Sequence, residues 1–218
     1  MFGLPKSTEY GKRIPKQKFY ENITVTPSLK RAFIDQIKTI RWTHKIASST
    51  INLAEGKNVS EIEVFEITLN TKALDENVLR QIDREVPYHI LYILRYEEEC
   101  QTWIGYKEAA ESGSNAFKVV KYYHTDWSDE SDIVIQIEGL SLDGVYENLV
   151  RRIGGEALLP EQEGEDLKES INRDEEIQKL KKQIDVLQNK IRKEKQLNVQ
   201  MKLNEELRDL KKKLENLK

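Results

Sequence analysis

The sequence predicts an α+β domain arranged as a two-layer sandwich on a mixed or antiparallel sheet, followed by a C-terminal coiled-coil helix. Segments with strand periodicity cluster in the middle of the chain, and helical segments flank them rather than alternating with each strand. From Leu159 onward there is no aromatic residue. A highly charged segment without aromatic residues does not build a globular core, so the end of the chain should be a paired helix.

These observations divide the chain into three parts. Residues 1–158 form a globular domain with a basic N-terminal arm, residues 159–173 form an acidic linker, and residues 174–218 form the coiled coil. The domain carries 20 Lys/Arg against 24 Asp/Glu, so it is only slightly acidic. No apolar run approaches the roughly 20 residues that a bilayer requires, and the N-terminal sequence has no signal peptide. We therefore expect a cytoplasmic protein without a membrane-spanning segment.

Residues 1–22 read as an extended arm, because they contain prolines and glycines between isolated apolar residues that could anchor it to the domain. A helix should begin after Thr26, a good cap, with Pro27 in its first turn. Its apolar face runs from Leu29 to Ile40, and a strand should follow at residues 41–46. Further helices are predicted at residues 75–86 and 142–153, and strands at 61–69, 88–96, 101–107, 117–124 and 133–137.

The strongest pattern lies at the C-terminus, where residues 174–218 contain neither Gly nor Pro. Two blocks show the apolar spacing of three and four residues that defines a heptad seam. Isoleucine at a and leucine at d in the first block favour two strands. The predicted partner-binding residues are Ile177, Leu180, Ile184, Leu187, Ile191, Leu197, Met201, Leu203, Leu207, Leu210, Leu214 and Leu217.

The two blocks are out of phase, since the first register places Glu194 and Asn198 on the seam. A break of this kind indicates a hinge, a stutter or a special contact. We expect a continuous rod of about 68 Å, with a folded-back hairpin as the alternative. The exposed seam needs a cover, which is a second copy of the chain, a helix of another protein or, as the structural alternative, the chain's own domain. Leu197, Met201 and Leu203, at the break, are predicted to make a partner-specific contact.

Catalytic signals are weak. The sequence has no phosphate-binding glycine motif and no nucleophile elbow, and its single cysteine, Cys100, excludes a multi-cysteine metal site. The order of elements allows a restriction-endonuclease-like fold, for which Glu61, Glu63 and Glu66 are the only candidate metal-binding acids. The lysine expected two residues after such an acid is missing, and acids on the solvent face of a half-exposed strand explain the pattern. We therefore predict no metal, no cofactor and no catalytic residue.

Nucleic-acid binding is a second alternative. The arm carries five basic residues, with aromatic residues interleaved, which is a composition suited to phosphate contact and base stacking. However, the sequence contains no motif of a known nucleic-acid-binding domain. Any contact with nucleic acid is therefore expected to be indirect. The candidate residues are Lys6, Lys12, Arg13, Lys16 and Lys18.

Several stretches resemble an uncharacterised bacterial family, the domain of unknown function numbered 4391. They are MFGLPKSTEYGKRIPKQKFYENITVTPSLKRAFIDQIKTIRW, VSEIEVFEITLN, LDENVLRQIDREVPYHILYIL, WIGYKEA and KEKQLNVQMKLNEELRDLKKKL. The resemblance implies no established activity. Members are often encoded beside helicases and DNA methyltransferases in restriction or phage-defence gene clusters, so it implies a helicase-like ATPase or a DNA methyltransferase as partner.

Two function hypotheses follow. The first is a non-catalytic accessory or assembly subunit that binds partner proteins through its coiled coil. The second is a DNA-binding subunit or a restriction-endonuclease-like nuclease subunit, with either an active or a degenerate active site.

Overall fold

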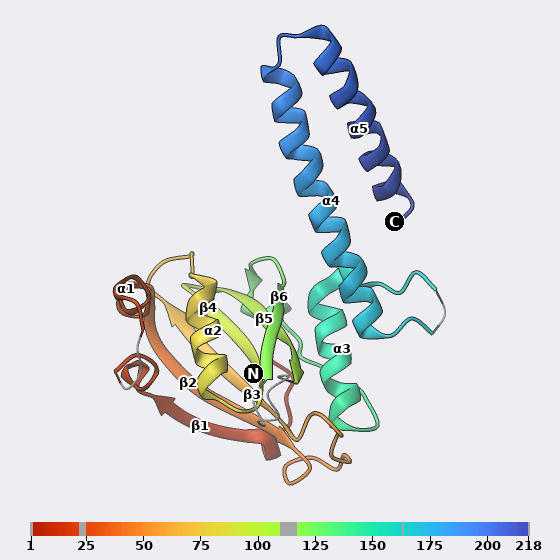
Figure 1. Cartoon of the computed structure of the whole chain (residues 1–218). Coiled ribbons are helices and arrows are strands. Elements are labelled where there is room, and N and C mark those ends of the chain that lie inside the picture. The colour runs from red at the N-terminus through yellow and green to blue at the C-terminus, as the bar shows by residue number, and fades with distance from the viewer. Residues whose placement is uncertain (1, 22–24, 110–116, 163, 218) are drawn as a thin grey trace. The chain divides into compact units, whose positions relative to one another are not determined.

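The computed structural model of the chain describes residues 2–21, 25–109, 117–162 and 164–217. The chain forms two compact units, Met1–Gly154 and Gly155–Lys218. The strands of the described residues all belong to the first unit, and the second contains two long helices (Figure 1). The α+β class is therefore confirmed. Among the described residues, none of the helices combines the length and the apolar character that a membrane crossing requires.

The first unit is built on a seven-stranded mixed sheet in which β1 to β6 lie in sequence order and β7 pairs with β5. Only β3 and β4 are parallel among the paired strands of the described residues. Helix α2 (Glu76–Glu85) connects them, as a parallel crossover requires. The strands are β1 (Glu9–Ile14), β2 (Ile37–Ala47), β3 (Glu61–Leu69), β4 (His89–Tyr96), β5 (Glu99–Ala109), β6 (Phe117–His124) and β7 (Ser128–Asp129).

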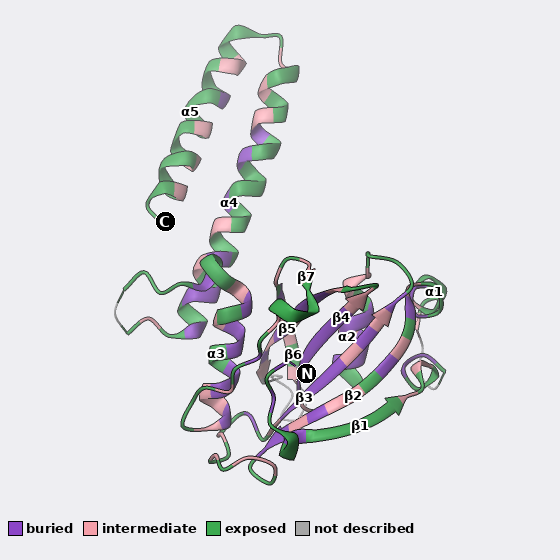
Figure 2. Cartoon of the chain, turned by 180° about the vertical axis from the view of Figure 1, so that it is seen from behind, coloured by how far each residue is buried: buried purple, intermediate pink, exposed green. Residues whose placement is uncertain are grey.

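Helices pack on both faces of this sheet. Helices α1 (Pro27–Gln36) and α2 cover one face, where Phe33 and Leu79 share a core with Phe65 of β3. Helix α3 (Leu142–Gly154) packs on β3, β5 and β6 from the other side, and the ring of its Tyr146 lies 4.3 Å from that of His89. The predicted two-layer arrangement is therefore not confirmed. Figure 2 shows that burial concentrates along the central strands, whereas β1 is largely exposed.

The start of α1 follows the prediction, but its end does not. The Thr26 hydroxyl accepts a hydrogen bond from the N–H of Leu29 at 3.2 Å, and Pro27 occupies the first turn. The helix ends at Gln36, and Ile37 begins β2 with no loop between them. Ile40 is therefore a strand residue, so the prediction that it continues the helix was wrong. The β-branched residues that follow Gln36 favour a strand and outweigh the helical spacing.

Two other segments differ from their predictions. In the arm, Glu9–Ile14 forms the edge strand β1, which was not predicted, whereas Phe19 and Tyr20 are buried in the core, as expected of residues that anchor the arm. Residues 133–137 do not form a strand. Ile135 is buried, and its N–H donates to the carbonyl oxygen of Phe2 at 2.8 Å. This segment therefore bonds to the N-terminal residues and does not join the sheet.

A buried ion pair holds the C-terminal half of α2 against the sheet. Lys107 of β5 lies 2.8 Å from Asp83 of α2, and the two side chains are 1% and 2% exposed. The Tyr122 hydroxyl of β6 donates to the second oxygen of Asp83, and Lys107 also donates to the carbonyl of Tyr88. Each charge is therefore compensated inside the core, as burial requires. This arrangement fixes where the chain turns from α2 into β4.

Replacing Lys107 with methionine should destabilise the first unit by about 3–5 kcal/mol, because Asp83 would stay buried without its counter-charge. Urea denaturation followed by circular dichroism measures this free energy of unfolding. Lys118→Met, on the exposed face of the neighbouring strand β6, is the matched control and should change stability by less than about 0.5 kcal/mol. Equal effects of the two substitutions would contradict the role of the ion pair.

Candidate functional site

The three candidate acids of β3 do not form one cluster. Glu61 and Glu63 alternate with Ile62 and share the face that α2 covers, whereas Glu66 lies on the opposite face. Glu66 is paired there with Arg95 at 3.4 Å, and Arg95 also binds Glu130 at 2.7 Å. Within the described residues, no group of three or more His, Cys, Asp or Glu side chains could hold a metal ion.

Glu63 is the unexpected member of this set. The segment that follows α2 covers the face of β3 that carries Glu63, and the residue is only 1% exposed. The prediction that these acids lie on a solvent face was therefore wrong for Glu63. Both of its carboxyl oxygens are shielded from solvent, and its nearest polar neighbours are the Glu61 carboxyl and the Trp42 side chain. Its neighbour Glu61 is instead bound by Lys45 at 2.7 Å.

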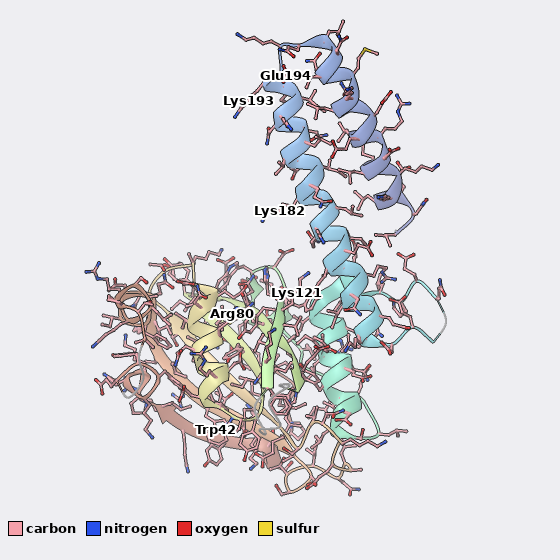
Figure 3. The ribbon with its side chains drawn as sticks, viewed as in Figure 1. Trp42, Arg80, Lys121, Lys182, Lys193 and Glu194 are labelled. Carbon is pink, nitrogen blue, oxygen red and sulfur yellow. The ribbon has the colours of Figure 1, made fainter. Side chains whose placement is uncertain are left out.

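Glu63 lines a cavity of about 290 Å³ between the sheet and the C-terminal end of α2. Its walls include the rings of Trp42 and Phe65, whose centroids are 6.1 Å apart, and its rim includes Lys18 and Glu85. Trp42 lies where β2 meets the exposed strand β1 (Figure 3). The cavity is therefore mostly aromatic and apolar, with one buried carboxyl.

This setting changes the acidity of Glu63. Burial, and after it the hydrogen bond and the charge of the neighbouring Glu61 carboxyl, raise its pKa to about 8. Lys45 and Trp42 act in the opposite direction but are outweighed. At neutral pH the Glu63 carboxyl is therefore mostly protonated in the ligand-free chain.

The predicted nucleic-acid residues do not share one face. Lys12 and Arg13 are neighbours on β1, so their side chains project to opposite sides of the sheet. Lys16 donates to the carbonyl oxygens of Ile34 and Ile37 at 3.0 and 2.6 Å. These bonds attach the short 3₁₀ helix Lys16–Phe19 to the end of α1. Lys6 is exposed, and Lys18 lies on the rim of the Glu63 cavity.

The C-terminal unit is a helical hairpin. Helix α4 (Leu167–Lys193) and helix α5 (Leu197–Glu215) pack against each other (Figure 1). The expectation of a continuous rod was therefore wrong, and the alternative of a folded-back hairpin is what the structure shows. The chain turns at Glu194, whose backbone is extended and whose carboxyl accepts the N–H groups of Lys195 and Gln196 at 2.8 Å each. The turn coincides with the break in the heptad pattern.

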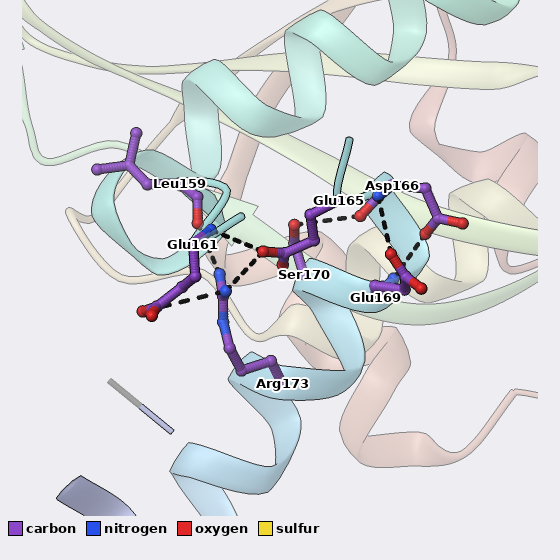
Figure 4. A network of polar contacts seen from close by, with 7 residues as sticks. All are labelled: Leu159, Glu161, Glu165, Asp166, Glu169, Ser170 and Arg173. Carbon is purple, nitrogen blue, oxygen red and sulfur yellow. Dashed lines mark hydrogen bonds and ion pairs between the residues drawn. The ribbon is translucent and has the colours of Figure 1, made fainter. Parts of the chain in front are cut away.

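Helix α4 begins at Leu167, earlier than the predicted start at residue 174. Asp166 and Glu169 form a reciprocal capping box, with bonds of 2.8 and 3.1 Å (Figure 4). Arg173 then binds Glu165 at 2.8 Å and the carbonyl oxygen of Leu159 (Figure 4). The acids of the predicted linker therefore stabilise the first turns of α4.

The hairpin only partly buries its apolar seam. Leu180, Ile184, Leu187 and Leu203 are buried at 7–8% exposure. Ile177, Ile191, Leu207, Leu210, Leu214 and Leu217 are half-buried. Leu197 and Met201 remain 69% and 59% exposed. Of the three residues predicted to contact a partner, Leu203 is therefore used inside the hairpin and the other two lie on its surface.

Sequence reasoning missed the polar residues that matter most in the first unit. Asp83 follows the inward-facing Ile82 of an amphipathic helix, so its charge was expected to point outward. Lys107 lies in an alternating strand and shows no local sign of burial. Their pairing depends on tertiary contacts, and no spacing in the sequence reveals it.

The raised pKa of Glu63 makes stability depend on pH. The unfolded chain releases this proton near the ordinary value of 4.5, whereas the folded chain keeps it up to about pH 8. The folded state binds more protons in this window, so its stability falls as pH rises, by at most about 1.4 kcal/mol per pH unit. Glu63→Gln cannot titrate. The free energy of unfolding of the native chain minus that of the variant should decrease from about pH 5 to pH 8 and then level off.

Urea denaturation of both proteins across this pH range makes the comparison. Parallel stability curves would show that Glu63 titrates at an ordinary pKa.

The family model for Domain of unknown function (DUF4391) matches residues 2–214. No curated protein and no solved structure matches this chain. The family match extends over both structural units, from the N-terminal residues beside β1 to the end of α5. The resemblance seen in the sequence motifs is therefore confirmed, and the chain belongs to the DUF4391 family.

Proposed function

We propose that this protein is a non-catalytic assembly subunit whose α4–α5 hairpin binds an acidic amphipathic helix of a partner protein. The observation that carries the proposal is the exposed pair Leu197 and Met201 beside a seam that is only half-buried at its ends. These two residues lie four positions apart, so they share one face of α5. Two exposed apolar side chains beside a half-buried apolar stripe form a surface that a third helix can cover. This mode of binding is helix-in-groove recognition.

Two helices alone bury little of a heptad seam. In the buried middle of the hairpin, Leu180, Ile184 and Leu187 reach 7% exposure, but toward both ends the apolar side chains stay in contact with water. Each buried methylene contributes roughly 0.8 kcal/mol, so covering these ends with a third helix is favourable. This supports binding of a helix over a purely structural tail.

Charge favours a foreign helix over a second copy. From Ile177 onward the chain has 13 Lys/Arg and 6 Asp/Glu. Lys182 and Lys193 extend from the side of α4 opposite α5 (Figure 3). Two copies would bring like charges together, whereas an acidic helix would neutralise them.

The family resemblance directs the choice of partner. A helicase-like ATPase or a DNA methyltransferase of a bacterial restriction or phage-defence system is the first class to test. In such a complex this chain would supply assembly, and the partner would supply the chemistry on DNA. The nuclease alternative has less support, because Glu66 faces away from Glu61 and Glu63, and Lys45 already binds Glu61.

The test is co-purification of the full chain with a helicase-like ATPase or a DNA methyltransferase of such a system. Leu197→Asp combined with Met201→Asp should lower the affinity for the partner by roughly 100-fold, because two apolar anchors become charged. Val186→Asp, at an equally exposed apolar position of α4 (62%), is the matched control and should leave binding unchanged. Circular dichroism should show the same helix content in all three proteins.

Light scattering measures the mass of the free chain and of the complex. It therefore distinguishes a partner helix from a second copy of the chain on the apolar surface of the hairpin. A monomeric free chain that forms a defined heterocomplex supports the proposal. A stable homodimer that the double substitution dissociates would assign the seam to a second copy, and the proposed foreign helix would be wrong.

A further inference from the structure

We propose that a cavity between α3 and β5 binds a free aliphatic amino acid, with the two charged groups of the ligand at the opening and its side chain inside. The cavity has a volume of about 220 Å³ and lies entirely within the first unit, so it is separate from the hairpin. Strands β4 and β5, helix α3 and the chain from Thr125 to Ile135 line it.

The inner wall of the cavity is aliphatic. Leu91 of β4 is buried there together with Leu149 and Ile153 of α3. Ile135 completes the wall, and its N–H donates to the carbonyl oxygen of Phe2 at 2.8 Å, which holds this part of the chain in place. A branched aliphatic side chain that enters the cavity therefore exchanges water for apolar contact, which favours binding.

The volume limits the size of the ligand. About 220 Å³ equals the space of roughly seven water molecules at ~30 Å³ each. It is smaller than the roughly 300 Å³ at which sites for drug-sized ligands begin. One short side chain with its backbone atoms fits this space, whereas a nucleotide does not.

Hydroxyl groups lie between the inner wall and the opening. The Thr125 oxygen accepts the N–H of Thr102 at 3.1 Å and the Thr102 hydroxyl at 3.3 Å, so the hydrogen of the Thr125 hydroxyl can be donated elsewhere. Ser128 also lines the cavity, and its hydroxyl makes no hydrogen bond to another described residue. Both residues are half-buried. They can therefore donate to a carboxylate that sits near the opening.

Two opposite charges stand at the opening. Asp132 and Arg152 line the cavity, and both are exposed to solvent. Arg152 uses one nitrogen, Nη2, for its bonds to Gln136 and, at 3.5 Å, to Glu138. Its Nε and Nη1 donors are left for a ligand. Asp132 forms no ion pair with the residues that the structure describes.

Together these groups select a zwitterion. An ammonium group can pair with Asp132, and a carboxylate can pair with Arg152 and accept from the hydroxyls of Thr125 and Ser128. An α-amino acid carries both charges and its side chain on one carbon atom, so all three can be placed at once. A ligand with a single charge would leave Asp132 or Arg152 without its partner.

Isothermal titration of the full chain with L-leucine tests the site. Saturable binding with a dissociation constant on the order of 1 mM or tighter is expected. Glycine should bind at least roughly tenfold more weakly, because it has no side chain to cover the aliphatic wall. No saturable binding of L-leucine, or equal binding of the two amino acids, would overturn the proposal.

Probes that lack one charge test the recognition of a zwitterion. Isopentylamine keeps the side chain and the ammonium group, and isocaproate keeps the side chain and the carboxylate. Each should bind at least roughly tenfold more weakly than L-leucine. If either probe bound as tightly as L-leucine, the opening would not recognise both charges and the proposal would be wrong.

Substitutions assign the two charges to residues. Asp132→Asn and Arg152→Gln should each weaken L-leucine binding by roughly tenfold or more, and circular dichroism should show that both variants stay folded, since both positions are exposed. Asp132→Asn should not weaken isocaproate binding, because that probe has no ammonium group. Asp129→Asn, at an exposed position of the same segment outside the cavity lining, is the matched control and should bind like the native chain. Unchanged L-leucine binding by either folded variant would overturn the assignment.

One further probe distinguishes a free amino acid from the end of a peptide. L-leucinamide represents the first residue of a peptide, which has the ammonium group but not the carboxylate. Weaker binding of L-leucinamide than of L-leucine supports a free amino acid as the ligand. Equal or tighter binding would assign the cavity to a peptide N-terminus, and the proposed ligand would be wrong.

Discussion

The ion pair between Asp83 and Lys107 fixes the C-terminal end of α2 on the sheet, and the rest of the first unit is arranged around it. Lys107 comes from β5, Asp83 from α2 and its third partner Tyr122 from β6. Three elements far apart in the sequence therefore meet at one buried charge pair. The chain leaving α2 passes directly into β4, so this pair also determines where the central parallel strand begins.

The same anchor shapes the Glu63 cavity. Glu85, Val86 and Pro87 follow Asp83 and form one wall, while Glu63 and Phe65 of β3 form the floor. Because the segment after α2 packs over this face of β3, Glu63 is enclosed and cannot be hydrated as a surface acid would be. The buried Glu63 carboxyl is therefore balanced by protonation and by its neighbours Glu61 and Trp42, and not by water.

The second unit is stabilised mainly by its turn and by a partly buried apolar seam between two helices. Its hairpin has few means of enclosing apolar residues, because each helix has only one neighbour within the unit. Glu194 ends α4 by accepting the backbone N–H groups of the turn, and Gln200 donates to the carbonyl oxygens of Ile191 and Glu194 at 3.4 and 3.3 Å. The turn is thus stabilised locally, and the seam is left partly open. Assembly with another helix is the direct way to complete it.

The sequence alone determined the elements with strong local signals. Capping by Thr26, the amphipathic α2 followed by Pro87, the apolar β4 and the helical character of the C-terminal segment were all predicted from local patterns, because these signals act over one or two turns. It also located the heptad break, and only the tertiary structure decided that the chain reverses there.

The structure also decided which residues are buried together. The end of α1, the absence of a strand at residues 133–137 and the burial of Glu63 all depend on neighbours distant in the sequence. Alternation in β3 places Glu61 and Glu63 on one face, but it cannot say that α2 and its buried ion pair close over that face. The physical reason is that burial of a charge is set by all the elements around it, whereas sequence periodicity reports only one element at a time.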